Sequence, residues 1–193
     1  MDDDLDVLEE DRQTALMAIG RLGQVVGGLP WFSRLGQPLS QDEEAMAQRY
    51  LDMLGFPDAV PVMTEDWAEA GVAAENPDFD SEGWEVEEQL RADLSREALT
   101  YFDETELGDA LAKIADTAGP VVLDAGASAA SLWAVEDGSI IDAAAGQAVQ
   151  ACYCAGLVLA AQAVEDHPFA LKFRLFEMGR WPIGLSGRTF HIF

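Results

Sequence analysis

The longest uncharged run of the chain, residues 143–164, is the feature that most constrains the fold. Small residues recur at every fourth position within it, at Ala144, Ala148, Cys152, Gly156 and Ala160. Because positions four apart share one helix face, this strip predicts a helix that a second helix approaches closely. The run is also long enough to cross a bilayer. Its glutamines and its alanine-rich composition instead favour a buried central helix.

Helical periodicity marks five further segments before this run. Their approximate ranges are 4–26, 40–54, 64–74, 81–102 and 107–118. The second begins with a capping-box pattern, in which Ser40 and Glu43 satisfy each other's backbone donors. Gly119 and Pro120 are expected to end the last, because proline interrupts helical hydrogen bonding. Short polar turns between the helices predict a mainly α, orthogonal or bundle-like helical domain.

The C-terminal residues carry a different pattern. Residues 171–175 alternate apolar and basic side chains, which favours a strand, whereas Asp166 and Gly179 would equally frame a short helix over 168–178. Both interpretations stay open. Residues 189–193 predict a terminal strand, with a turn at 184–187. We therefore expect a single domain over 1–193, with acidic helices in 1–119 and, in 120–193, the central helix and a small C-terminal β element that is basic.

The net charge of −25, from 36 acidic and 11 basic residues, narrows the choice of partners. Such a field repels nucleic-acid phosphates and anionic lipid surfaces, so we expect neither nucleic acid nor membrane as a partner. It favours basic proteins and metal cations, and it equally fits acidity that serves only solubility or a salty cytosol. The acidic N-terminus lacks the basic start and apolar core of a signal peptide, which predicts a cytoplasmic protein.

The segment between residues 42 and 106 holds twenty acidic and three basic side chains. Large aromatic residues are interleaved with them. Such a surface suits a basic protein partner, because charge steers the encounter and aromatic burial supplies affinity. We therefore predict a non-enzymatic interaction or inhibitor-type protein whose acidic face, about 65–106, binds a basic protein partner. The expected partner-binding residues are Trp67, Glu69, Phe79, Trp84, Glu85 and Glu88. Alternatively, Trp67 and Trp84 anchor their helices in the core.

A calcium-binding protein is another alternative to the interaction protein. The stretch that starts at Asp78 places acidic side chains at Asp78, Asp80 and Glu82, with Gly83 next. Alternate acidic residues followed by a glycine let carboxylates converge on one hard cation. This stretch resembles an EF-hand loop, which implies Ca²⁺ binding by these three residues. Gln89 stands where that loop has its last carboxylate. An acidic start of a helix explains the same pattern without a metal.

No catalytic set stands out in the sequence. His167 and His191 are the only histidines, and no neighbouring spacing marks either as part of a triad. Cys152 and Cys154 have a spacing typical of neither a disulfide framework nor a zinc site, so we expect two small core residues. These observations leave catalysis unassigned and lean towards a protein that is not an enzyme.

The sequence also permits a ligand-binding function and a homodimer. A small ligand-binding domain or enzyme would use an anion site in the basic C-terminal segment, at Arg180, Trp181 and Arg188. A homodimer is the other, because the strip of small residues between 144 and 160 could receive a second copy of the chain as well as a helix of the same chain.

Overall fold

The computed structural model describes residues 2–75 and 81–193, which form seven α-helices, one 3-10 turn and three short strands. The helices are α1 (Asp2–Val25), α2 (Gln41–Leu54), α3 (Trp67–Ala74), α4 (Ser81–Ala98), α5 (Glu104–Leu132), α6 (Gly138–Ala160) and α7 (Pro168–Glu177). The 3-10 turn is η1 (Val26–Gly28), and the strands are β1 (Val60–Met63), β2 (Pro182–Ser186) and β3 (Thr189–Ile192). The predicted class, mainly α-helical with a small C-terminal β element, is confirmed.

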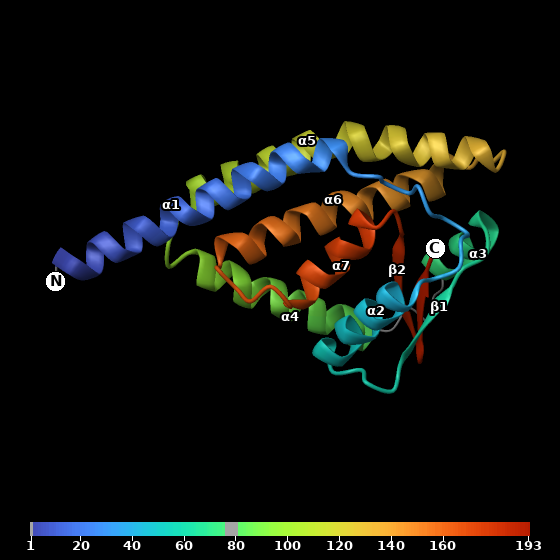
Figure 1. Cartoon of the computed structure of the whole chain (residues 1–193), viewed down its shortest axis with the longest axis horizontal. Helices are drawn as coiled ribbons and strands as arrows, with labels where there is room; N and C mark the ends of the chain where they lie inside the picture. Colours follow the sequence, from blue (N-terminus) through green and yellow to red (C-terminus); the bar gives the residue numbers. More distant parts are fainter. Residues whose placement is uncertain (1, 76–80) are drawn as a thin grey trace.

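Helix α6 lies at the centre of the fold, with α1, α4, α5 and α7 packed around it (Figure 1). By length and composition α6 would pass for a membrane span, yet 61% of its most apolar stretch is buried inside the protein. That burial is typical of the core helix of a folded domain. The prediction of a central buried helix over the uncharged run is therefore confirmed.

The strip of small residues on α6 faces other helices of the same chain. All five of its members are buried. A Cβ atom added at Gly156 would lie 2.6 Å from Cδ1 of Ile114 and 2.9 Å from Cδ2 of Leu111, both on α5. The missing side chain therefore lets α5 and α6 approach, which is the close contact that the four-residue spacing predicts.

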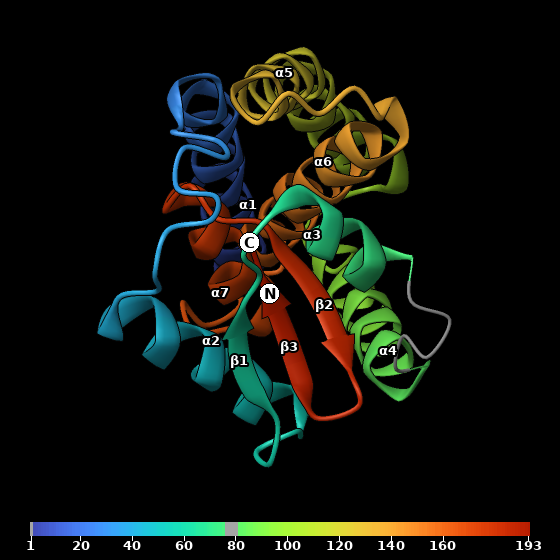
Figure 2. The same cartoon turned by 90° about the vertical axis from the view of Figure 1, so that its right-hand side faces the viewer.

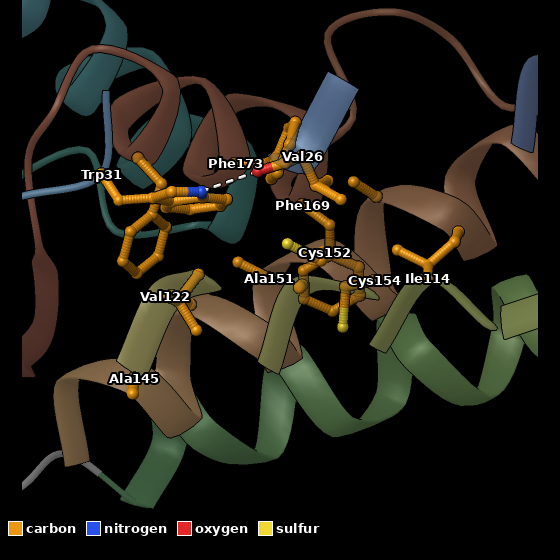
Figure 3. Close-up of a cluster of buried hydrophobic side chains, with 14 of the residues drawn as sticks. Val26, Trp31, Ile114, Val122, Ala145, Ala151, Cys152, Cys154, Phe169 and Phe173 are labelled. Atoms are coloured by element: carbon orange, nitrogen blue, oxygen red, sulfur yellow. Dashed lines mark hydrogen bonds between the residues drawn. The ribbon is translucent and has the colours of Figure 1, made fainter. Parts of the chain in front are cut away.

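The core around α6 also buries the tryptophan and both cysteines that Figure 3 labels. Trp31 packs edge-on against Phe173, at 6.3 Å between ring centroids, and its indole Nε1 donates a hydrogen bond of 2.8 Å to the carbonyl oxygen of Val26. Cys152 and Cys154 are free thiols in this core. Their expected role as small core residues is confirmed.

The three strands form one small sheet in the order β1-β3-β2. β2 and β3 form an antiparallel hairpin, and β1 runs parallel to β3 with Val60 opposite Thr189 (Figure 2). Leu171 and Leu175 of α7 and Leu51 of α2 belong to the same buried cluster as the sheet residue Phe190. The hairpin agrees with the predicted terminal strand, but its turn lies at 187–188 and not at 184–187, since residues 184–186 belong to β2. β1 was not predicted, because its partner strand lies more than a hundred residues away.

The alternating pattern at 171–175 predicts a strand wrongly, since this stretch lies in α7. α7 packs against α6 on one side and α2 on another, so apolar residues occupy more than one of its faces. A helix buried on several sides loses the simple period of an amphipathic helix. The flanking residues were the better indicator: His167 caps the helix, its Nδ1 accepting a hydrogen bond of 3.2 Å from the N–H of Phe169.

The predicted helix end at Gly119 and Pro120 is also wrong. α5 continues through Pro120 to Leu132. Proline leaves the carbonyl of the residue four positions earlier, Asp116, without its usual donor. Both Pro120 and Asp116 lie on the exposed side of the helix, where water can replace that donor, while Ala118 and Val122 are fully buried. Packing on either side of the proline therefore outweighs the lost hydrogen bond.

Candidate functional site

The acidic segment 65–106 is spread over the length of the molecule. α3 lies at the right-hand end in Figure 1 and the turn between α4 and α5 lies in the left half, inward of the N-terminal part of α1, with α4 running between them. The acidic residues in this segment therefore do not gather on one compact face. Among the described residues of the segment, acidic and exposed aromatic side chains occur together on α4.

The predicted partner-binding residues lie in different environments. Trp67 is buried, with its ring 5.4 Å from Phe193, whereas 56% of the Trp84 side chain is exposed on α4. Glu85 is exposed and Glu88 is half-buried on the same helix. Glu69 is exposed on α3, where its carboxylate accepts a hydrogen bond of 2.7 Å from the N–H of Glu65. Phe79 lies outside the described residues.

The predicted calcium loop falls largely outside the described part of the chain, because Asp78 and Asp80 belong to residues 76–80. Glu82 is described and lies exposed in the first turn of α4. Within residues 2–75 and 81–193, no three His, Cys, Asp or Glu side chains are grouped so that they could hold a metal ion.

The predicted anion-binding residues are placed apart by the fold. Arg180 is fully buried, and Trp181 is fully buried with its indole Nε1 donating a hydrogen bond of 3.0 Å to Oε1 of Gln147. Arg188 is exposed in the hairpin turn, where its Nη2 lies 3.5 Å from Oδ2 of Asp58. Of the three, only Arg188 presents its side chain to solvent.

Each donor of the Arg180 guanidinium has a partner within the chain. Nε and Nη2 donate to the two carboxylate oxygens of Glu43, at 2.8 and 3.1 Å. Nη1 and Nη2 donate three more hydrogen bonds to the carbonyl oxygens of Arg34, Gln37 and Pro38, at 2.5–2.7 Å. A guanidinium has five N–H groups, so no donor remains for an external anion. Arg180 instead holds the segment between η1 and α2 in place.

Glu43 completes this buried pair as its anion. Burial raises the pKa of its carboxyl, but hydrogen bonds from Arg180 and from the N–H and hydroxyl of Ser40 more than offset that effect and lower the pKa to about 2. The hydrogen bond from the Ser40 N–H to the Glu43 carboxylate is one half of the predicted capping box, and the Glu43 N–H completes it by donating to Oγ of Ser40, so the box is confirmed. Sequence reasoning found the cap and missed its second role as the partner of Arg180.

A cavity of about 190 Å³ lies where α4, α6, α7 and β2 meet. Trp84 stands at its edge. Five polar residues converge on it from three helices: Glu87 and Glu88 of α4, Gln147 and Gln150 of α6, and Lys172 of α7. A small cavity with several convergent polar groups and an aromatic side chain is the usual form of a recognition site.

Beside the cavity, one carboxylate oxygen joins three elements. Oε1 of Glu87 accepts a hydrogen bond of 2.5 Å from the hydroxyl of Tyr50 and one of 2.7 Å from Nζ of Lys172. Lys172 Nζ also lies 5.8 Å from the centre of the Tyr50 ring. Burial, the charge of Glu87 and this hydrogen bond raise the pKa of Tyr50 well above its ordinary value. Tyr50 is therefore a neutral donor at physiological pH.

The same cluster keeps Glu87 ionised. Burial raises the pKa of its carboxyl, but the charge of Lys172 and the hydrogen bonds from Lys172 and Tyr50 outweigh burial and lower it. Cys154 also lines the cavity, and burial raises the pKa of its thiol to about 12, so it is not a thiolate nucleophile near neutral pH. The arrangement can hold and orient a polar group, and none of these three residues changes its protonation state near neutrality.

Sequence reasoning missed Tyr50, Glu87, Gln147 and Lys172 as site residues. They come from four helices and form no local motif, so only the tertiary structure brings them together. One sequence property did distinguish Lys172: the chain has only two lysines among its eleven basic residues.

Comparisons of the chain with protein-family models, with curated proteins and with solved structures found no match.

Proposed function

We propose that this chain is a non-enzymatic binding protein that recognises a basic side chain of a protein partner at the cavity beside Trp84. The observation that carries the proposal is the exposed indole of Trp84 at the edge of this cavity, on a strongly acidic helix. A large apolar side chain that is more than half exposed next to a cavity is a frequent anchor of protein interfaces.

Charge supports a basic partner. α4 carries six acidic and two basic residues, and both arginines already pair with acidic residues three positions away, Arg91 with Glu88 and Arg96 with Asp93. The remaining field attracts cations and raises the rate of encounter. A cationic side chain that lies over the indole of Trp84 gains a further cation–π interaction.

The cavity itself can accept the end of such a side chain. Among the described residues Glu88 pairs with Arg91 alone, and both are partly exposed, so this pair contributes about 0–1 kcal/mol and exchanges readily with a cation from outside. The positive charge of Lys172 is compensated by Glu87 at 2.7 Å. Gln147 and Gln150 add polar side chains at the opposite wall on α6.

Titration behaviour supports binding rather than acid–base chemistry. A general acid or base works best when its pKa lies near the working pH. At this cavity the pKa values of Tyr50 and Cys154 are raised away from neutrality, and that of Glu87 is lowered.

The test is a capture experiment from native lysate, with the purified chain immobilised at low and at moderate salt and bound proteins identified by mass spectrometry. Three variants accompany the wild type: Trp84→Ala, Glu88→Lys and Asp116→Lys. The last two change the net charge equally, but Asp116 is exposed on α5, outside the cavity lining. Circular dichroism first verifies that each variant folds.

We expect one basic protein to be retained by the wild type and by Asp116→Lys at low salt and released as salt rises. Trp84→Ala should reduce its retention about tenfold, because an interface anchor contributes at least 1–2 kcal/mol. Glu88→Lys should abolish retention through repulsion. Equal retention by all four proteins, or none by the wild type at low salt, would contradict the proposal.

A further inference from the structure

An apolar surface is exposed at the end of the molecule where α3 meets the turn between α5 and α6, the end that Figure 2 faces. Leu132 is 87% exposed, Val72 72% and Trp133 45%. We call these three residues the tip surface. Single exposed apolar residues are common on proteins, whereas neighbouring ones beside a groove mark interaction sites.

Two open hollows flank the tip surface. One, of about 530 Å³, lies between the 31–37 segment and the end of α5, with Leu132 and Trp133 in its wall. The other, of about 390 Å³, lies between α3 and the start of α6, with Val72 and Val135 in its wall. The two sets of lining residues meet in the α5–α6 turn, so the hollows are neighbours on one surface.

Trp133 is held in place by an aromatic stack that reaches the core. Its ring centroid lies 6.1 Å from that of Phe193. The Phe193 centroid lies 5.4 Å from that of Trp67, and the Trp67 centroid lies 6.0 Å from that of Trp181. Gly36 closes the other side: at φ +68°, a Cβ atom there would come within 2.8 Å of the Trp133 ring. A side chain fixed in this way loses little conformational entropy when a partner covers it.

The charged residues in the lining of the two hollows are acidic. Glu75 and Asp137 line the α3 hollow, Glu136 is exposed in the adjoining turn, and neither hollow has a Lys or Arg in its lining. The chain has no Lys or Arg at all between residues 114 and 171. A second copy of the chain would bring the same acidic residues face to face, which is unfavourable, whereas a partner with basic residues around an apolar centre complements this surface.

We propose that the tip surface docks an amphipathic helix of another protein, with apolar side chains in the two hollows and basic side chains against Glu75 and Glu136. A helix presents side chains about 5–6 Å apart along one face, which suits adjacent hollows on either side of an exposed tryptophan. The surface is separate from the cavity beside Trp84: the two share no lining residue. On α6 their nearest members, Ile140 and Gln147, lie about 10 Å apart along the helix.

The probe is a fluorescein-labelled peptide of roughly 18 residues that contains only leucine and lysine, with the leucines on one helical face. A second peptide has the same composition in an order that scatters the leucines over all faces. Fluorescence anisotropy at about 0.15 M salt, where long-range attraction is screened, gives the affinity of each peptide for the purified chain. The chain variants are Leu132→Asp, Val72→Asp, Glu136→Lys and, as the control at the other site, Trp84→Ala. All four changes are at exposed positions, so each variant is expected to fold.

We expect the amphipathic peptide to bind at least tenfold more tightly than the scattered one. Leu132→Asp should weaken it at least tenfold, and Val72→Asp and Glu136→Lys several-fold, while Trp84→Ala leaves it unchanged. Equal binding of the two peptides would show attraction by charge alone and would overturn the proposal, as would unchanged binding to Leu132→Asp. Analytical ultracentrifugation adds a third result: self-association that Leu132→Asp abolishes would assign the surface to a second copy and overturn the proposal. Each result is independent of Trp84, so failure here differs from failure of the proposed function.

Discussion

Two of the ion pairs that join distant parts of the chain have different surroundings. Arg180 and Glu43 are both fully buried, and every donor of the arginine is used inside the protein. Lys172 and Glu87 are about one-fifth exposed and line the cavity that Trp84 borders. The first pair organises a loop, and the second lies where an outside group can reach it.

The contrast shows how a charged residue in a fold can be assigned a role. A buried charge is tolerated only with a complete set of partners, and that completeness leaves nothing for a ligand. A pair beside a cavity keeps part of its hydration and some freedom to exchange partners. Arg180, which sequence reasoning selected for an anion site, thus has a structural role, whereas the unselected Lys172 borders the candidate site.

The largest expected loss of stability comes from breaking the fully buried pair of Arg180 and Glu43, called here the enclosed pair. Arg180→Ala leaves the carboxylate of Glu43 buried without its main partner and frees three carbonyl groups, so we expect a loss of about 3–5 kcal/mol of unfolding free energy. Urea denaturation followed by circular dichroism measures it. Arg188→Ala, at the exposed hairpin turn, is the control and should stay within about 0.5 kcal/mol of wild type. A loss below 1 kcal/mol for Arg180→Ala would mean that the loop does not depend on the pair.

An acid titration gives the next largest effect. The pKa of Glu43 is about 2 in the folded chain, below its ordinary value of 4.5. A lowered folded-state pKa adds stability above pH 4.5, here roughly 3 kcal/mol, which is lost as the pH falls from there towards 2. The stability gap between wild type and Glu43→Gln should therefore narrow over that interval. Glu44→Gln, a change at an exposed neighbour, should show a small gap. A Glu43→Gln gap that stays constant would refute the assignment.

The smallest effect is expected at the cavity pair. Glu87→Ala removes the acceptor of Tyr50 and Lys172, but the ammonium group of Lys172 is partly solvated, so we expect a loss of about 1–3 kcal/mol. Tyr50→Phe, which removes one of the two hydrogen bonds, should cost less. Denaturation curves of both variants beside Arg180→Ala rank the two pairs directly. If Glu87→Ala loses as much unfolding free energy as Arg180→Ala, the distinction between the enclosed pair of Arg180 and Glu43 and the accessible pair of Lys172 and Glu87 fails.

Local rules predicted the parts of the fold that depend on neighbouring residues. The capping box of Ser40 and Glu43 is present at the start of α2, and the small-residue strip lies on a buried central helix. These local rules failed where packing between helices outweighed the preference of neighbouring residues. α5 continues past Pro120 because buried residues on both sides hold it, and α7 is helical because several of its faces are covered.

The candidate site was only partly within reach of the sequence. Trp84, Glu85 and Glu88 were selected because aromatic and acidic residues alternate there, and all three lie on α4, with Trp84 and Glu88 lining the cavity. The same pattern selected Trp67, which is buried. Composition alone does not tell which tryptophan of an acidic segment faces the core, since that depends on the elements packed against each helix.

By itself, then, the sequence determined the helical class, the central helix and the net negative charge, because spacing and composition act through neighbours along the chain. The tertiary structure alone decided which basic residues are enclosed, which tryptophan is exposed, and that residues from three helices and a strand meet at one cavity, with Tyr50 of a fourth helix beside it. These outcomes depend on contacts between residues far apart in sequence: Glu43 with Arg180, and Tyr50 and Glu87 with Lys172. No local pattern encodes such contacts, because their free energy depends on burial that exists only once the chain has folded.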